Sequence, residues 1–330
     1  MILRARTIGK TSLIALWRNK RGVEIYNKLA AVPVTAVALG MFDGVHAGHR
    51  SIISRAVTLA KETGGKSAVV TFVNHPFTVL AEQNVPLMIC GRETKERILR
   101  HLGVDILFNM TFTKEFSRIT PENFLSMLKD NIAPQFVVTG ANYTFGAKGM
   151  GNKRTLLRLA PTYNFAVEIC PTVTALGKTV SSTRIRASIT GGDLPTANAL
   201  LDAPFTYGGR VMHGDKRGRT IGFPTANLVI EKPRAMLPNG AYAARVRLNS
   251  LKCGDEEIFP ALANVGDNPT FAGKERRLEV NLQNFSRDIY GQYIEVEFLG
   301  KLRDEQKFAG ADELVKQLKR DRENAAAFWR

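Results

Sequence analysis

Strand-like and helix-like stretches alternate along the first two hundred residues of the chain. The β-prone apolar runs lie at 35–39, 67–72, 106–108, 136–138 and 166–169. After the first run, Ile52, Ala56 and Leu59 recur at the spacing of one helix face. Thr120 and Pro121 are typical of the start of another helix. This alternation predicts an α/β domain in which helices cover both faces of a Rossmann-like parallel sheet.

From Phe205 onward the pattern changes to strand-like segments separated by glycine-containing turns. These segments are 210–212, 242–248, 261–265, 278–282 and 293–298. They predict an antiparallel β-barrel, and a helix from Asp312 to the C-terminus follows it. The predicted division is 1–190 for the first domain, 191–204 for a linker and 205–330 for the second domain.

A glycine-rich, basic segment at 208–228 is the first candidate for chemistry. It contains Gly214, Gly218 and Gly222, with Lys216 among its cations. Thr225 and Asn227 follow, and residues two apart in an extended chain share one face. Oxygen ligands on one face suit Mg²⁺ beside the phosphates of a nucleotide. The spacing is not that of a Walker A motif, and a basic hairpin with a tight turn is the alternative interpretation.

A pair of histidines, His46 and His49, follows the first predicted strand at the start of a helix. At a spacing of three residues they share one face of that helix. The helix N-terminus adds partial positive charge and free N–H groups, so this face can bind phosphate and stabilise a leaving pyrophosphate. A zinc pair and two surface histidines are the alternatives, although zinc requires at least three protein ligands.

Two motifs together resemble a known family. Residues 37–49 are similar to the His-x-Gly-His site of adenylyltransferases, and residues 208–228 are similar to the signature of riboflavin kinases. In this order, and from about Val34 to the C-terminus, the chain resembles the bifunctional riboflavin kinase/FAD synthetases of bacteria. The resemblance implies that ATP phosphorylates riboflavin to FMN, and that ATP then adenylylates FMN to FAD with release of pyrophosphate.

The resemblance also implies the residues of the adenylyltransferase site. It assigns ATP binding to Phe42, Asp43, Gly44, His46, His49, Ser182, Thr183 and Arg186, of which His46, His49 and Arg186 are catalytic. The loop after 136–138 resembles the flavin and phosphate loop, in which Asn142 binds phosphate and Phe145 packs beside a ring. Without the resemblance, this loop is a turn whose two aromatic residues belong to the core.

For the kinase site, the resemblance assigns ATP binding to Gly214, Lys216, Gly218, Gly222, Thr225 and Asn227, the last two also holding Mg²⁺. It assigns Glu279 as the base that accepts a proton from the riboflavin 5′-hydroxyl. The pattern alone places Glu279 on the polar face of a strand, where a solvated carboxylate is the alternative. Asn281 stands nearby, at a position where the family commonly has a histidine.

Composition limits the remaining interpretations. The net charge of +16 is compatible with nucleic acid, a membrane surface, small polyanions or a general basic bias. Three scattered cysteines argue against a disulfide framework and favour a reducing cytosol. We expect cytoplasmic localisation, small-molecule substrates and no nucleic-acid or membrane partner, with weak homo-oligomerisation left open. The alternative functions are a kinase whose first half is an inactive scaffold, and a basic nucleic-acid-binding or flavin-sensing regulator.

Overall fold

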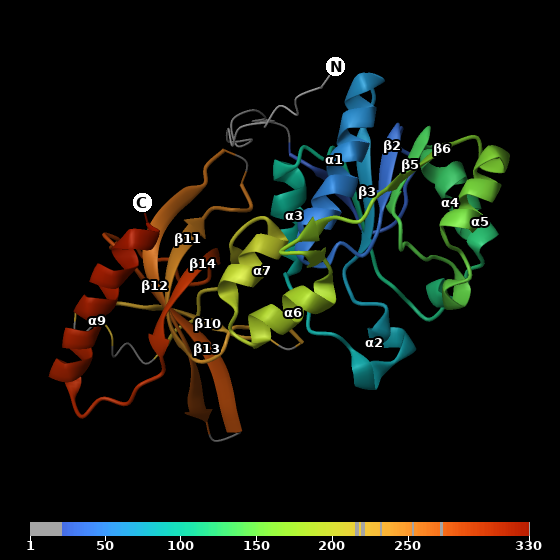
Figure 1. The fold of residues 1–330 in the computed structure, drawn as a ribbon. Coiled ribbons are helices and arrows are strands. Elements are labelled where there is room, and N and C mark those ends of the chain that lie inside the picture. The colour runs from blue at the N-terminus through green and yellow to red at the C-terminus, as the bar shows by residue number, and fades with distance from the viewer. Residues whose placement is uncertain are drawn as a thin grey trace, which may run out of the picture.

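The computed structural model of the protein describes residues 22–214, 218, 222–231, 233–252, 254–270 and 273–329. They form two six-stranded sheets and one two-stranded sheet, with helices packed around them (Figure 1). The first elements are β1 (Glu24–Tyr26), β2 (Ala36–Leu39), α1 (Ala47–Glu62), β3 (Ser67–Phe72), α2 (Phe77–Leu80), α3 (Arg92–His101), β4 (Ile106–Met110), α4 (Pro121–Ile132), β5 (Phe136–Gly140), α5 (Lys153–Leu159) and β6 (Ala166–Cys170). The remaining elements are β7 (Thr174–Ala175), β8 (Lys178–Thr179), α6 (Ser182–Thr190), α7 (Leu194–Leu201), β9 (Phe205–Arg210), β10 (Ala226–Val229), β11 (Gly240–Leu248), β12 (Glu257–Thr270), β13 (Gly273–Leu282), β14 (Tyr293–Asp304) and α9 (Ala311–Ala325).

The first sheet is parallel and has the strand order β1-β4-β3-β2-β5-β6. Strand β1 lies at one edge beside β4. The chain then crosses to the middle with β2, builds outward through β3 and β4, and returns to add β5 and β6 on the other side. The direction of strand addition therefore reverses between β2 and β5. In sheets of this kind, ligands bind beyond the carboxyl ends of the strands at that reversal.

Alternating side chains of β2 explain why helices cover both faces of this sheet. Ala36 and Ala38 belong to one core cluster with residues of α1 and α3. Val37 and Leu39 belong to another cluster with residues of α4 and α5. Successive side chains of a strand point to opposite faces, so a strand buried on both sides must be apolar throughout. The predicted Rossmann-like fold is confirmed.

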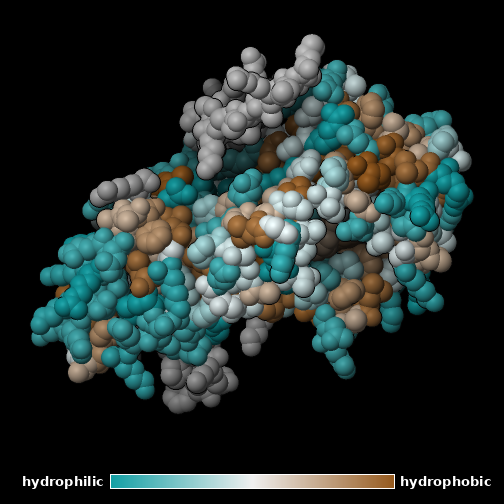
Figure 2. Space-filling model, in the orientation of Figure 1, coloured by the Kyte–Doolittle hydropathy of each residue, from teal (hydrophilic) through white to brown (hydrophobic). Residues whose placement is uncertain are grey.

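The second sheet is antiparallel and has the order β10-β13-β12-β11-β14-β9. It curls into the predicted barrel, and Met212, two residues after the edge strand β9, forms an antiparallel bridge with Asn227 of the other edge strand, β10. Helix α9 lies along the outside of this sheet (Figure 1). The guanidinium of Arg303 binds the buried carboxylate of Asp321 and holds the helix there. The outer face of α9 is hydrophilic (Figure 2).

Helices α6 and α7 connect the two sheets and pack on the barrel. Ile185 and Ile189 of α6 and Leu200 of α7 lie in the same core cluster as the barrel strands. Most of the predicted linker, 191–204, is thus a packed helix. None of the helices in the described ranges combines the length and the apolar character needed to cross a membrane.

Asn198 fastens α7 to the barrel through two hydrogen bonds. Its side-chain oxygen accepts the N–H of Phe205 at 2.7 Å, and its amide donates to the carbonyl of Phe298 at 3.1 Å. Asn198 belongs to the first of two Pro-Thr-Ala-Asn sequences in the chain, the second of which is 224–227. In the first copy, the asparagine is a structural residue.

We expect Asn198→Ala to lower the free energy of unfolding by about 1–3 kcal/mol, because it leaves the buried N–H of Phe205 without an acceptor. Urea denaturation followed by fluorescence measures the change. The matched control is Thr196→Ala in the same tetrapeptide, which should stay within about 0.5 kcal/mol of the parent protein. Equal loss of stability in both variants would contradict the role given to Asn198.

Candidate functional site

The turn after β2 is bent so tightly that it needs unusual backbone conformations. Phe42 has φ 48°, and Gly44 has φ 78°. A Cβ atom on Gly44 would lie 2.7 Å from the side chain of Ile89, so glycine is required there for space as well as for conformation. Strain of this kind is typical of loops that hold functional groups in place.

His46 and His49 come together at the start of α1. The Nδ1 atom of His46 accepts the N–H of His49 at 3.3 Å and so caps the helix. The two rings stack with their centroids 3.5 Å apart, and the edge of the His49 ring meets Phe42. His46 is buried, whereas His49 is half-buried. The Nδ1 atom of His49 has no hydrogen-bond partner among the described residues.

Burial keeps both imidazoles neutral near pH 7. It lowers the pKa of His46 to about 4, with a smaller contribution from the charge of Arg186. It lowers the pKa of His49 well below the ordinary value, and the charges of His46 and Lys95 add to this shift. Each neutral ring offers one N–H donor and one acceptor. The pair therefore meets phosphate oxygens through hydrogen bonds at a helix N-terminus.

Asp43 and Arg186 form a buried ion pair at 2.9 Å beside the histidines. Asp43 also accepts the N–H of Ile89 at 2.9 Å, and Nε of Arg186 donates to the carbonyl of Leu87 at 2.7 Å. Two of the three guanidinium nitrogens of Arg186 are thus committed to protein oxygens. The arrangement fixes the direction of Arg186 before any substrate binds.

The N-terminus of α6 lies against the same turn. The hydroxyl of Ser182 is 3.4 Å from the carbonyl oxygen of Asp43, and Thr183 beside it is exposed. Arg184 points elsewhere and donates to the carbonyls of Ala175 and Lys178, which holds the β7–β8 hairpin. The structure therefore brings Ser182, Thr183 and Arg186 to the turn of the two histidines.

The loop after β5 separates its two candidate residues. Asn142 is exposed, next to the turn that follows β2, since β2 and β5 are neighbours. Phe145 is buried at 7 % exposure and packs against Phe124, with ring centroids 5.7 Å apart. The ring of Phe145 therefore belongs to the core of the first half.

Lys95 is a functional candidate that the sequence analysis missed. It is 3 % exposed, and its ammonium donates to the carbonyls of Met41 and Phe72 at 3.2 and 3.1 Å. Burial lowers its pKa. The ammonium of Lys95 thus binds the backbone at the start of the histidine turn and places a positive charge near His49. A lysine within the polar run 92–97 of a helix gives no sequence signal for such a position.

The second site is a row of polar side chains across three barrel strands. Asn227 on β10 is directly opposite Glu279 on β13, which in turn is opposite Asn264 on β12. Side chains opposite one another in an antiparallel pair lie on the same face of the sheet. They line a cavity of about 370 Å³ together with Thr225 and Gly218.

The glycines beside this cavity allow the backbone to approach closely. A Cβ atom on Gly214 would lie 2.4 Å from Nδ2 of Asn227, and one on Gly218 would lie 2.3 Å from the carbonyl oxygen of Phe223. Gly222 has φ 79°, which glycine adopts most readily. The predicted phosphate contact of Lys216 falls outside the described residues.

Asn281 supports the loop that leads into the cavity. Its amide donates to the carbonyl of Pro224 at 2.7 Å, and its side-chain oxygen accepts from Gln283 at 2.6 Å. Asn281 thus fixes Pro224, which immediately precedes Thr225. The position where the family commonly has a histidine serves here to anchor the backbone.

A short segment, Leu87 to Cys90, joins the two halves. The carbonyl of Leu87 and the N–H of Ile89 bind Arg186 and Asp43, as described above. Between them, the N–H of Met88 donates to the carbonyl of Pro233, and the N–H of Ala235 donates to the carbonyl of Met88, at 2.8 and 2.9 Å. The barrel therefore holds the segment that orients the ion pair of the first half.

The parallel sheet with a histidine turn at its reversal point, followed by a barrel with a cavity beside a row of polar side chains, defines a two-domain enzyme that handles nucleotide phosphates. Comparisons agree in each half: residues 30–184 match the family model for FAD synthetase, and residues 201–329 match that for riboflavin kinase. The chain belongs to the family of bifunctional riboflavin kinase/FMN adenylyltransferases, and the resemblance of its motifs is confirmed.

Two proteins with this description illustrate the similarity. The chain is 38 % identical over 295 residues to the one from Listeria monocytogenes, covering 89 % of this chain and 92 % of that protein. It is 35 % identical over 302 residues to the one from Bacillus subtilis, with the same coverage. A crystal structure from Streptococcus pneumoniae, described as a macrolide-efflux protein, superposes with a TM-score of 0.78 at 34 % identity, covering 92 % of this chain and 98 % of that one.

Among the described residues, the zinc alternative for the histidine pair lacks a third ligand. Within the part of the chain that the structure describes, no three His, Cys, Asp or Glu side chains gather where they could hold a metal ion. A structural zinc site needs four ligands, and a catalytic one needs three from the protein.

Acidification should destabilise the protein through His46. An unfolded chain protonates histidine near pH 6.5, whereas folded His46 stays neutral down to about pH 4, so the unfolded state binds more protons between these values. Stability attributable to His46 is therefore present near pH 7 and is lost as the pH falls. We expect a loss of about 2 kcal/mol between pH 7 and pH 5.

The variant His46→Asn retains a good helix cap and removes the titrating group. Unfolding free energies from urea denaturation at pH 5, 6 and 7 should fall less steeply in this variant than in the parent protein. His213→Asn, which changes an exposed histidine of the second half, is the control and should keep the parent slope. An unchanged slope in His46→Asn would show that His46 does not carry the effect.

Proposed function

We propose that the chain makes FAD from riboflavin in two steps, one in each half. The barrel phosphorylates riboflavin to FMN with ATP, and the parallel-sheet half adenylylates FMN with ATP. The observation that carries this proposal is the presence of two separate groups of polar side chains, the His46–His49 turn and the Asn227–Glu279 row, one in each half. We divide the chain at 1–190, 191–204 and 205–330, which is supported by the family matches that end at 184 and begin at 201.

In the kinase step, the oxygen of the riboflavin 5′-hydroxyl bonds to the γ-phosphorus of ATP. The carboxylate of Glu279 accepts the proton of that hydroxyl. The bond between the γ-phosphorus and the bridging oxygen breaks, and ADP leaves. Glu279 mainly orients the hydroxyl, since phosphoryl transfer depends on positioning and charge neutralisation. The register that sets Glu279 opposite Asn227 supports this role.

The oxygen atoms near Glu279 are ligands of the kind that Mg²⁺ prefers. Oxygens of Thr225 and Asn227 would hold the ion, with the phosphates of ATP as further ligands. The space kept open by Gly214 next to Asn227 supports the fit, since any larger residue would fill it. When bound, Mg²⁺ neutralises charge on the transferring phosphate. Gly218 and Gly222, together with Lys216, would line the path of the phosphate chain.

In the adenylyl transfer step, a phosphate oxygen of FMN bonds to the α-phosphorus of ATP, and the bond from that phosphorus to the bridging oxygen breaks. Pyrophosphate leaves with the electron pair. His46 and His49 donate hydrogen bonds to the phosphates, while Arg186, Ser182 and Thr183 bind the triphosphate. Catalysis is by positioning and electrostatic stabilisation, with no nucleophilic side chain.

Phe42, Asp43 and Gly44 contribute by shaping the turn. Asn142 is the phosphate contact from the loop after β5. The burial of Phe145 favours a supporting role for its ring beneath that loop. Cys90 and Cys170 are free and buried, which agrees with a cytoplasmic enzyme. Its substrates are riboflavin, FMN and ATP, and we propose no nucleic-acid or membrane partner.

A substitution at the site of one half should leave the reaction of the other half intact. His49→Ala should lower the rate of FAD formation by at least about 100-fold and leave the rate of FMN formation unchanged, because it removes a phosphate contact of the transfer step only. Glu279→Gln should slow FMN formation by at least about 100-fold and spare FAD formation from supplied FMN. Chromatography of flavins after incubation with ATP and Mg²⁺ measures both.

Loss of both activities in either variant, in a protein that still unfolds cooperatively, would overturn this division of labour. The control is Asp130→Asn, which changes an exposed residue near the end of α4. It should keep both rates within about twofold, since surface changes of this kind have small effects.

A further inference from the structure

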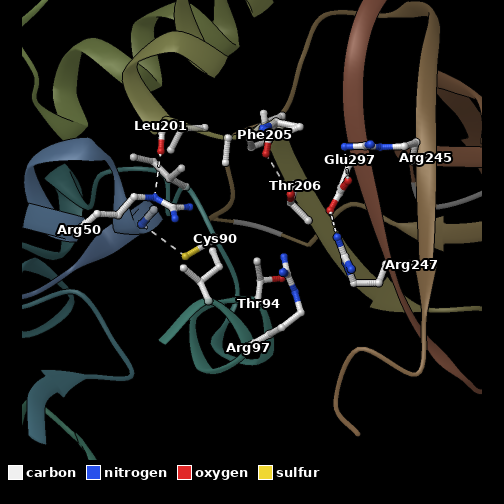
Figure 3. Close-up of a pocket in the computed structure, with 15 residues that line it drawn as sticks. Arg50, Cys90, Thr94, Arg97, Leu201, Phe205, Thr206, Arg245, Arg247 and Glu297 are labelled. Atoms are coloured by element: carbon white, nitrogen blue, oxygen red, sulfur yellow. Dashed lines mark hydrogen bonds and ion pairs between the residues drawn. The ribbon is translucent and has the colours of Figure 1, made fainter. Parts of the chain in front are cut away.

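A second cavity, of about 210 Å³, lies between the two halves (Figure 3). The first half contributes Arg50 from α1 and Arg97 from α3, and the barrel contributes Arg245 and Arg247 from β11. In Figure 3 the side chains of Arg50 and Arg97 extend toward Arg247 across the cavity. Four guanidiniums from both halves therefore surround one space that neither proposed reaction uses.

The carboxylates around the cavity do not match these cations in number. Glu297 is the acid in the lining, and Arg245 and Arg247 share it at 3.1 and 2.7 Å. Behind the lining, Arg97 binds the fully buried Glu295, and Arg247 also binds Glu256 at 2.6 Å. These three carboxylates thus form ion pairs with three of the four guanidiniums.

Arg50 is the cation left over. Its Nε donates to the carbonyl of Leu201 at 3.2 Å, and it forms no ion pair with a described residue. Burial lowers the pKa of Arg50, and the nearby charge of Arg97 lowers it further, while Asp202 acts in the opposite sense. Arg50 is half-buried, so its guanidinium is partly removed from water without a carboxylate bonded to it, and a bound anion would supply that partner.

We propose that this cavity binds a small inorganic oxyanion of the phosphate class, orthophosphate or pyrophosphate. Planar guanidiniums bind two oxygens of such an anion at once. The hydroxyls of Thr94 and Thr206 add polar groups to the lining. The cavity is little more than half the size of the one beside Glu279, so it suits an inorganic anion better than a flavin or a nucleotide.

An anion in this position would touch the adenylyltransferase turn. Gly44 and Cys90 line the cavity, and the N–H of Gly44 lies 3.3 Å from the sulfur of Cys90. The site therefore connects the barrel to the turn that carries His46. The choice of pyrophosphate as the natural occupant rests on the proposed function, because the transfer step releases pyrophosphate. The proposal that the cavity binds an oxyanion does not depend on that function.

Calorimetric titration of the full chain with sodium phosphate, and separately with sodium pyrophosphate, tests the site without turnover. Arg245→Gln should raise the Kd about tenfold, because it removes a charge-assisted hydrogen bond. Glu297→Gln should lower the Kd severalfold, because it removes the negative charge and keeps the hydrogen-bonding shape. The anion that binds more tightly identifies the preferred occupant.

Both nucleotide sites also bind phosphates, but neither contains Arg245 or Glu297, so their contribution is the same in all variants. Arg210→Gln, which changes a barrel arginine that donates to the carbonyl of Gly291, is the charge-matched control and should leave the Kd unchanged. Equal Kd values in the parent and both cavity variants, or weaker binding in Glu297→Gln, would overturn the proposal. If Arg245→Gln does not fold, Glu297→Gln decides alone. If the cavity does not bind these anions, the proposal of two flavin reactions still stands, because neither reaction uses the cavity.

Discussion

The buried carboxylate of Asp43 is the interaction on which the first site depends. A carboxylate at 1 % exposure is very costly to bury unless hydrogen bonds and a cation compensate it. Asp43 finds these in the N–H of Ile89 and the guanidinium of Arg186. The end of β2, the segment before α3 and helix α6 must therefore meet at one point. The histidine turn acquires its shape from that meeting.

The same constraint reaches the barrel through Met88. This residue lies between the two hydrogen bonds that serve Asp43 and Arg186, and its own backbone pairs with Pro233 and Ala235. These barrel residues come shortly after β10, which carries Asn227. The two halves are thus joined by main-chain hydrogen bonds in the segment that also orients Asp43 and Arg186.

Local patterns predicted the fold, and the resemblance of two motifs to a known family supplied the candidate residues of both sites. The period of the strands, the helix signals and the two motifs each depend on neighbours in the sequence, so they are readable without a structure. The pairing of Asn227 with Glu279 is different, because register across fifty residues is set by the whole sheet. The burial of Lys95 and Arg97 was not predictable either. The polar sequence of their helix predicts a solvent-exposed surface, yet the helix packs against the turn and the barrel.

The bridge at Met88 has a consequence for how such a protein can change over time. Because both hydrogen bonds use backbone atoms, the side chains of Met88 and Ala235 contribute nothing to them. Lineages can therefore exchange the half-buried side chain of Met88 more readily than that of Ala235, which is fully buried in the barrel core, provided that the path of the backbone is preserved. A hybrid protein built from two distant members would inherit a working joint wherever the chain kept an N–H at position 235, and proline there would break it.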